Sequence, residues 1–144
     1  MSRPTIYRYF VSKEELIDAL GKREYRRFNL VMDEAISRVT GVARLEAAVE
    51  VVATFVKDQP PGRLIDLEPG FANEQMARVL PMITEALRAV LRRCAREDGI
   101  NTVVAPRDVA GAIARIALSH YIFPDADRAA ARREIRAAAG LPAK

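Results

Sequence analysis

Apolar residues recur at intervals of three and four along most of the chain, a spacing that places them on one face of an α-helix. The first long stretch follows Ser12, a suitable N-cap, and Glu15 completes a capping box if it reaches back to the backbone of Ser12. The pattern predicts a helix from Lys13 to about Val39, stopped by Gly41. Its expected apolar side is Leu16, Ile17, Leu20, Phe28, Val31, Met32, Ala35, Ile36 and Val39.

The rest of the chain repeats this helical spacing between Gly and Pro residues, and its β-branched runs are short. An all-α fold is therefore expected. Pro81 predicts a break or kink in one helix, because proline removes a backbone N–H donor and restricts the residue before it. The further helices are expected over about 5–10, 42–57, 64–67, 73–97, 108–123 and 127–139.

The composition excludes several kinds of site. Of the 144 residues one is cysteine, Cys94, and one is histidine, His120, so neither a disulfide within the chain nor a cysteine-based metal site can form. The scattered acids supply no nucleophile–base pair, and there is no glycine-rich phosphate loop. We therefore expect no enzyme activity, cofactor or metal. The apolar runs are too short to span a bilayer and no signal peptide is evident, which predicts a soluble cytoplasmic protein.

The formal net charge of +4 is modest, but basic residues gather near the N-terminus. Residues 1–27 contain seven Lys or Arg and four Asp or Glu. A locally basic end can follow a phosphate backbone. On charge alone, a solvated helix face explains the same residues equally well.

The short helix over 5–10 has two apolar side chains, Ile6 and Phe10, that can face inward. The side chains left over are polar or amphipathic, namely Arg3, Thr5, Tyr7, Arg8 and Tyr9. Arginine can bond guanine with two hydrogen bonds, a threonine methyl can touch thymine, and a tyrosine hydroxyl can hold phosphate. Lys13, at the start of the next helix, is placed to reach a phosphate. Simple packing is the alternative explanation.

Residues 2–16, S-R-P-T-I-Y-R-Y-F-x-S-K-E-E-L, resemble the recognition helix and following turn of TetR-family (tetracycline-repressor-like) transcriptional regulators. The later layout is similar too, with an apolar helix ending in Phe-Pro and a basic last helix ending in Gly-Leu-Pro. The resemblance implies base-edge contacts for Arg3, Pro4, Thr5 and Tyr7, and groove or phosphate contacts for Arg8, Tyr9 and Lys13. It also implies a homodimer on a roughly palindromic double-stranded DNA operator.

By the same resemblance, residues 1–40 are a partial DNA-binding head and residues 41–144 an effector-binding and dimerisation domain. The family pattern has helices before the turn at which this sequence starts. We therefore hypothesise a misassigned start or a truncated gene. The expected function is a TetR-type repressor controlled by a small-molecule effector that shifts the helix over 13–39. The alternative is a truncated, dimerising ligand-binding module without operator recognition.

Two groups of residues are candidates for the roles of this second domain. An apolar effector pocket is expected from Phe55, Phe71, Met76, Met82, Ile83, Leu87 and Tyr121, although ordinary core is the alternative for each. The helix over 108–123 is apolar nearly all round, which predicts burial on more than one side, either in a dimer or in the chain's own core. The expected dimer interface is Ala110, Ile113, Ala114, Ala117, Leu118, Tyr121, Arg132 and Ile135. For His120 a hydrogen-bonded structural role competes with contact to a ligand.

Overall fold

The computed structural model describes residues 11–58, 69–102, 104–127 and 129–142. Within these ranges the regular structure consists of helices, without strands, which confirms the all-α prediction. The helices are α2 (Lys13–Ser37), α3 (Val42–Asp58), α5 (Pro69–Asp98), α6 (Pro106–Ile122) and α7 (Ala130–Ala138). The helices expected over 5–10 and 64–67 lie outside the described residues.

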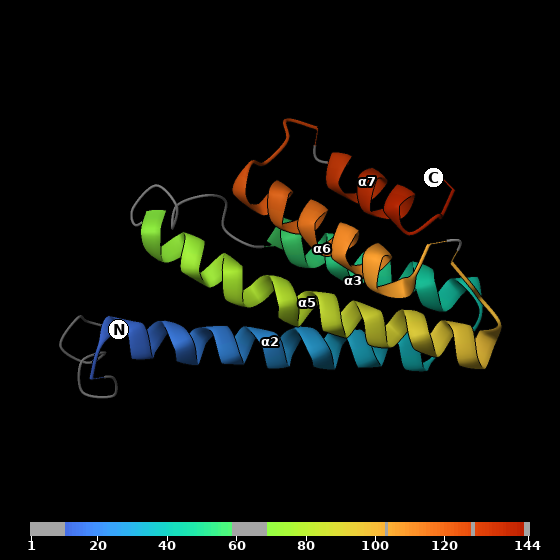
Figure 1. Ribbon diagram of the computed structural model, residues 1–144, viewed down its shortest axis with the longest axis horizontal. Coiled ribbons are helices and arrows are strands. Elements are labelled where there is room, and N and C mark those ends of the chain that lie inside the picture. The colour runs from blue at the N-terminus through green and yellow to red at the C-terminus, as the bar shows by residue number, and fades with distance from the viewer. Residues whose placement is uncertain (1–10, 59–68, 103, 128, 143–144) are drawn as a thin grey trace.

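Helix α3 occupies the centre of the arrangement. It packs against α2, α5, α6 and α7, and further contacts join α5 to α6 and α6 to α7. Figure 1 shows the two longest helices, α2 and α5, running along the long axis of the molecule, with α6 and α7 stacked beyond α5. The core between them contains side chains from all five helices, and its largest fully buried members are Ile113, Ile135, Val49, Val52 and Cys94.

Helix α2 begins at the predicted cap. The Ser12 hydroxyl accepts a hydrogen bond from the backbone N–H of Glu15 at 3.1 Å. The Glu15 carboxylate accepts from the N–H of Val11 at 2.7 Å, one residue before the partner expected for a capping box. The helix ends at Ser37, two residues earlier than predicted, and Gly41 then adopts a φ of 63°. That left-handed conformation suits glycine and allows the tight turn into α3.

The expected apolar side of α2 is buried only in its C-terminal half. Phe28, Met32 and Ile36 are at most 3% exposed, whereas Leu20 in the N-terminal half is 46% exposed. Val31 is an exception within the C-terminal half, at 45% exposed. The expected apolar side is therefore not buried along its whole length. The reason is the length of α3, since Phe55 near its end contacts Phe28, with the ring centroids 5.2 Å apart. Much of the N-terminal part of α2, whose fifteen residues before Phe28 span about 22 Å at 1.5 Å per residue, therefore extends beyond α3.

The expected break before Pro81 is absent, because α5 is one continuous helix with Pro81 inside it. The Thr84 hydroxyl donates to the carbonyl of Leu80 at 2.7 Å in this turn. The helix also begins at Pro69, four residues earlier than expected. A proline is well tolerated in a first turn, where its missing N–H would have no partner within the helix.

The last two helices also differ slightly from prediction. Helix α6 begins at Pro106, two residues early, and α7 begins at Ala130, three residues late. Asp127, expected inside α7, instead lies before it and accepts a hydrogen bond from the N–H of Ala129 at 2.9 Å. An aspartate in this position competes with the helix by satisfying a backbone N–H through its side chain.

Two buried arginines join segments that are distant in sequence. Arg44, 4% exposed, donates to the carbonyl of Val39 and lies 2.7 Å from Glu97 and 2.9 Å from Asp98. It therefore fixes the turn after α2 to the C-terminal end of α5. Arg136, 2% exposed, contacts Glu46 of α3 at 3.1 Å and donates to the carbonyl of Pro142.

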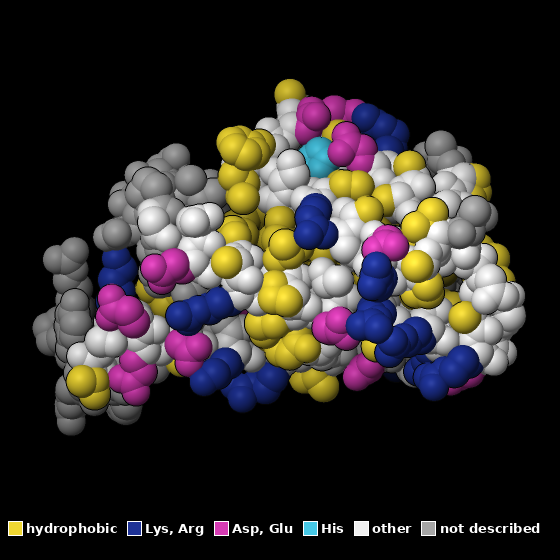
Figure 2. Space-filling view, viewed as in Figure 1, with side chains coloured by type: hydrophobic (Ala, Val, Ile, Leu, Met, Phe, Trp, Pro, Cys, Tyr) yellow, Lys and Arg dark blue, Asp and Glu magenta, His cyan; other side chains and the backbone are white. Residues whose placement is uncertain are grey.

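Hydrophobic side chains also reach the surface. Figure 2 shows them in the middle of the viewed face, over α5 and the end of α6, with basic side chains along the lower edge. Phe123 is 75% exposed and Leu30 70%. Among the described residues, no helix combines the length and the apolar character needed to cross a membrane.

Candidate functional site

The predicted DNA-contact residues lie at and before the start of α2. Lys13 is the first residue of that helix and its side chain is exposed. The other six, Arg3, Pro4, Thr5, Tyr7, Arg8 and Tyr9, lie outside the described residues. Their contacts with DNA stay a prediction, as does the phosphate contact of Lys13.

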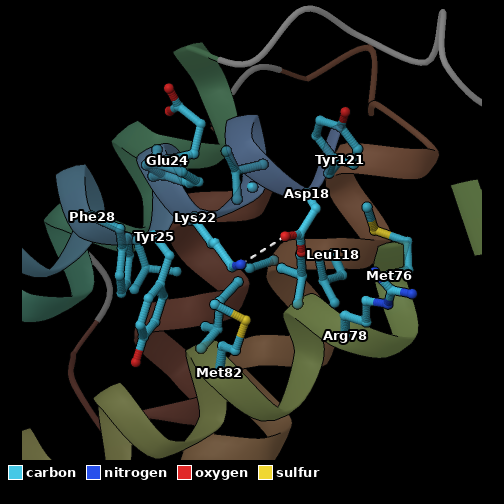
Figure 3. A pocket seen from close by; sticks show the side chains of 17 residues that line it. Asp18, Lys22, Glu24, Tyr25, Phe28, Met76, Arg78, Met82, Leu118 and Tyr121 are labelled. Atoms are coloured by element: carbon cyan, nitrogen blue, oxygen red, sulfur yellow. Dashed lines mark ion pairs between the residues drawn. The ribbon is translucent and has the colours of Figure 1, made fainter. Parts of the chain in front are cut away.

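A cavity of about 310 Å³ lies beside α2, whose residues line it from Asp18 to Phe28. Its walls come from the N-terminal half of α2, the end of α3, α5 around Pro81 and the end of α6 (Figure 3). Its lining is Asp18, Gly21, Lys22, Glu24, Tyr25, Phe28, Val52, Phe55, Val56, Met76, Arg78, Val79, Met82, Ile83, Ala117, Leu118 and Tyr121.

The structure brings together most of the residues expected in an effector pocket. Five of the seven, Phe55, Met76, Met82, Ile83 and Tyr121, line the cavity. Leu87 does not; it is 2% exposed and belongs to the core. The side chain of Phe71 lies outside the described residues. Whether this cavity holds an effector stays a prediction.

The inner wall of the cavity is apolar and well packed. Phe28, Val52 and Ala117 are at most 3% exposed there. The rings of Phe28 and Phe55 meet edge to face, with an interplanar angle of 76°. The guanidinium of Arg27 lies 5.3 Å from the centre of the Phe55 ring, which fits a cation–π contact.

The rim of the cavity is charged. The Lys22 ammonium lies 2.7 Å from the Asp18 carboxylate, and both side chains are largely exposed (Figure 3). The hydrogen bond from Lys22 lowers the pKa of Asp18, and the positive charges of Lys22 and Arg78 lower it further. Glu24 accepts a hydrogen bond from Arg27 at 3.0 Å. Arg78 forms no ion pair or hydrogen bond with the residues that the structure describes.

The contribution of α2 to this cavity was not predicted. The apolar periodicity identified Phe28 as a core residue but gave no reason to place Gly21 or Tyr25 at a cavity. Gly21 is the clearest signal in retrospect, because a glycine inside a helix lowers its stability unless the space is used. A Cβ added at Gly21 would meet nothing within 4 Å, so the residue leaves the wall of the cavity open.

The eight residues expected at a dimer interface lie mostly inside the single chain. Ala110, Ile113, Ala114, Ala117 and Ile135 are at most 1% exposed, because α3, α5, α6 and α7 pack over them. Leu118 and Tyr121 line the cavity, and Arg132 pairs with Glu50 of α3 at 2.7 Å. The arrangement matches the alternative of intrachain core for the five buried residues. A dimer of α6 and α7 stays a prediction and would use side chains other than these five.

His120 lies at a second, more polar hollow of about 700 Å³ between α3 and the segment joining α6 to α7. Its Nε2 atom lies 2.9 Å from a carboxylate oxygen of Glu134 on α7. This contact joins α6 to α7 and favours the structural role over contact with a ligand. In the described part of the chain, no group of three or more His, Cys, Asp or Glu side chains could hold a metal ion.

Comparison with known proteins concerns the N-terminal segment. Residues 1–20 match the model of the family described as bacterial regulatory proteins, tetR family. This segment of the chain is therefore similar to that family. The matched segment contains every residue predicted to contact DNA and ends beside Gly21, on the cavity wall. No curated protein and no solved structure matches the chain. That family is described as one of regulatory proteins.

Proposed function

We propose that this protein is a tetR-family transcriptional repressor that binds a roughly palindromic DNA operator as a homodimer and is controlled by a small molecule. The effector occupies the cavity between α2, α3, α5 and α6. The DNA contacts come from Arg3, Thr5, Tyr7 and their neighbours, with Lys13 on a phosphate. The family match to residues 1–20 supports the DNA-binding part of this proposal.

One observation supports the link between effector and DNA: α2 lines the cavity and also begins at Lys13, the predicted phosphate contact. Six residues of α2 line the cavity, from Asp18 to Phe28. Lys13 precedes Asp18 by five residues, which is about 7.5 Å along a helix axis. A ligand that moves the cavity wall therefore moves the start of α2, and with it the attached DNA-contact segment.

The two halves of α2 are held differently, which favours a pivoting motion. The C-terminal half is fixed by buried Phe28, Met32 and Ile36, and the following turn is fixed to α5 by Arg44. The N-terminal half extends beyond α3 and forms a wall of the cavity. A ligand changes the position of this half only if it binds one arrangement more tightly than the other. By linkage, DNA binding then changes ligand affinity by the same factor.

The DNA-binding part is tested by selecting duplexes from a random pool with the full chain and measuring affinities by fluorescence anisotropy. We expect enrichment of a two-fold symmetric sequence. Lys13→Ala should weaken binding to the selected and to unrelated duplexes alike, and should reduce the salt slope by about 1. Tyr7→Ala should instead reduce the preference for the selected sequence. Lys57→Ala, an exposed lysine on α3, is the control and should change neither quantity.

Two results would contradict the assignment. A pool that shows no enrichment would remove the claim of operator recognition. A Lys13→Ala variant with an unchanged salt slope would show that this lysine does not contact phosphate.

A further inference from the structure

We propose that the ligand of the α2/α3/α5/α6 cavity is an amphiphilic anion, a small carboxylic acid with an apolar body. The body fills the cavity and the carboxylate pairs with the guanidinium of Arg78 at the rim. This inference concerns the chemistry of the ligand and rests on the proposed function only for the ligand's role as effector.

The size and lining of the cavity define the body of the ligand. At roughly 30 Å³ for each water-sized group, 310 Å³ holds about ten such groups. Methionine, aromatic and aliphatic side chains form the inner wall, among them Met76, Met82 and Phe55. Methionine adapts its shape to irregular apolar ligands. A chain of about eight to ten carbons, or one substituted aromatic ring, fits this space.

The charges at the rim select among ligand head groups. Both acidic residues of the lining already have a cation, since Asp18 pairs with Lys22 and Glu24 with Arg27. A cationic ligand would have to compete with one of those pairs. Arg78 has no ion pair with the described residues, so an anion can reach it without breaking an ion pair to any of them. The planar guanidinium also matches a carboxylate, which it can bind through two parallel hydrogen bonds.

The positive charges at the rim also favour an anionic head group. The hydrogen bond from Lys22 lowers the pKa of Asp18, and the positive charges of Lys22 and Arg78 lower it further. They therefore stabilise a negative charge at this position. A ligand carboxylate beside Arg78 is attracted by the guanidinium, while Lys22, 2.7 Å from Asp18, offsets the negative charge of that carboxylate. Figure 3 shows Arg78 at the edge of the cavity near Met76.

The test uses three probes with the same ten-carbon body and different head groups: decanoate, 1-decanol and decylamine. Isothermal titration calorimetry with the full chain at neutral pH should give the tightest binding for decanoate. We expect it to bind about three- to tenfold more tightly than 1-decanol, the range for one partly exposed charged contact. Octanoate should bind roughly tenfold more weakly than decanoate, because two fewer methylene groups are buried.

Variants identify the contact. Arg78→Gln should lower decanoate affinity about three- to tenfold and leave 1-decanol affinity within about twofold. Arg92→Gln is the matched control, an exposed arginine on the same helix that does not line the cavity. It should leave both affinities unchanged. Because both arginines are exposed, neither variant should change the thermal unfolding temperature, which checks that each protein is folded.

The proposal is overturned if 1-decanol or decylamine binds as tightly as decanoate, or if decanoate shows no binding up to about 1 mM. It is also overturned if Arg78→Gln lowers the affinities for decanoate and 1-decanol by the same factor. The same experiments distinguish failure of this ligand class from failure of the proposed regulatory function. Decanoate binding that depends on Arg78 without any change in DNA affinity keeps the ligand class and removes its role as effector. Release of DNA by a neutral ligand, with no binding of decanoate, removes the ligand class and keeps the regulator.

Discussion

Replacing Arg44 by methionine tests whether a buried ion pair holds the C-terminal end of α2. Arg44 and Asp98 are each 4% exposed at the side chain and lie 2.9 Å apart. The Oδ2 atom of Asp98 has no hydrogen bond among the described residues, so the charge of Arg44 is its main compensation. Arg44→Met would leave this carboxylate buried without a cation. The variant also removes the hydrogen bond to the carbonyl of Val39.

Breaking a buried ion pair by removing one partner costs about 3–5 kcal/mol. The second acidic partner, Glu97, is 48% exposed and can return to water, which places the expected loss near the lower end, about 3 kcal/mol. In a chain of 144 residues this corresponds to a fall of roughly 10 °C in the thermal unfolding temperature. Circular dichroism of the helical signal during heating measures it, and urea unfolding gives the free energy.

Arg93→Met is the matched control. Arg93 pairs with the same Glu97 at 3.0 Å but is 37% exposed, so its loss should destabilise the protein much less than the loss of Arg44. A double variant, Arg44→Met with Asp98→Asn, removes the unpaired charge and should recover part of the stability. Equal destabilisation by Arg44→Met and Arg93→Met would refute the conclusion that Arg44 fixes the turn after α2 to α5.

Two further predictions concern backbone conformation and pH. Gly21→Ala should stabilise the protein by about 0.5–1 kcal/mol, because alanine is the better helix former and its Cβ meets no atom. Gly41→Ala should destabilise it by about 1–2 kcal/mol, because Gly41 has a φ of 63°; urea unfolding of both variants checks the opposite signs, and a gain at both positions would contradict the reasoning. Asp127→Ala should lower the unfolding temperature at neutral pH. The hydrogen bond from the N–H of Ala129 and the nearby Arg133 lower the folded-state pKa of Asp127 below its ordinary 3.8. The carboxylate therefore stabilises the fold above pH 3.8, and this contribution is lost as the pH falls through the lower folded-state pKa. The difference in unfolding temperature between the two proteins should therefore narrow below pH 3.8, and a difference that stayed constant down to about pH 2 would show that the charge of Asp127 plays no part.

Local signals in the sequence predicted the helices well. The Ser12 cap, Gly41 and the apolar spacing located α2 and α3 to within two residues at each end. Such signals act over a few neighbouring residues and need no knowledge of the rest of the fold. Pro81 misled because a missing N–H weakens a helix locally, whereas the packing of α5 against α3 and α6 keeps it continuous.

The candidate site was only half predictable for the same reason. Apolar residues on α3, α5 and α6 indicated a pocket, and Phe55, Met82 and Tyr121 do line one. The wall from α2 depends on where α3 ends relative to it, a tertiary relation that periodicity does not contain. The burial of Ile113 and Ile135 within one chain likewise depends on how α6 and α7 pack against α3. Apolarity alone predicts burial without identifying the partner.

The most direct test of the central claim is the affinity of the full chain for the selected duplex and for a scrambled duplex of the same composition, both measured by fluorescence anisotropy at one fixed salt concentration. Operator recognition predicts a preference of about a thousandfold or more for the selected sequence. Equal affinity for the two duplexes would contradict the account, and the dimerising ligand-binding module without operator recognition would then explain the chain better.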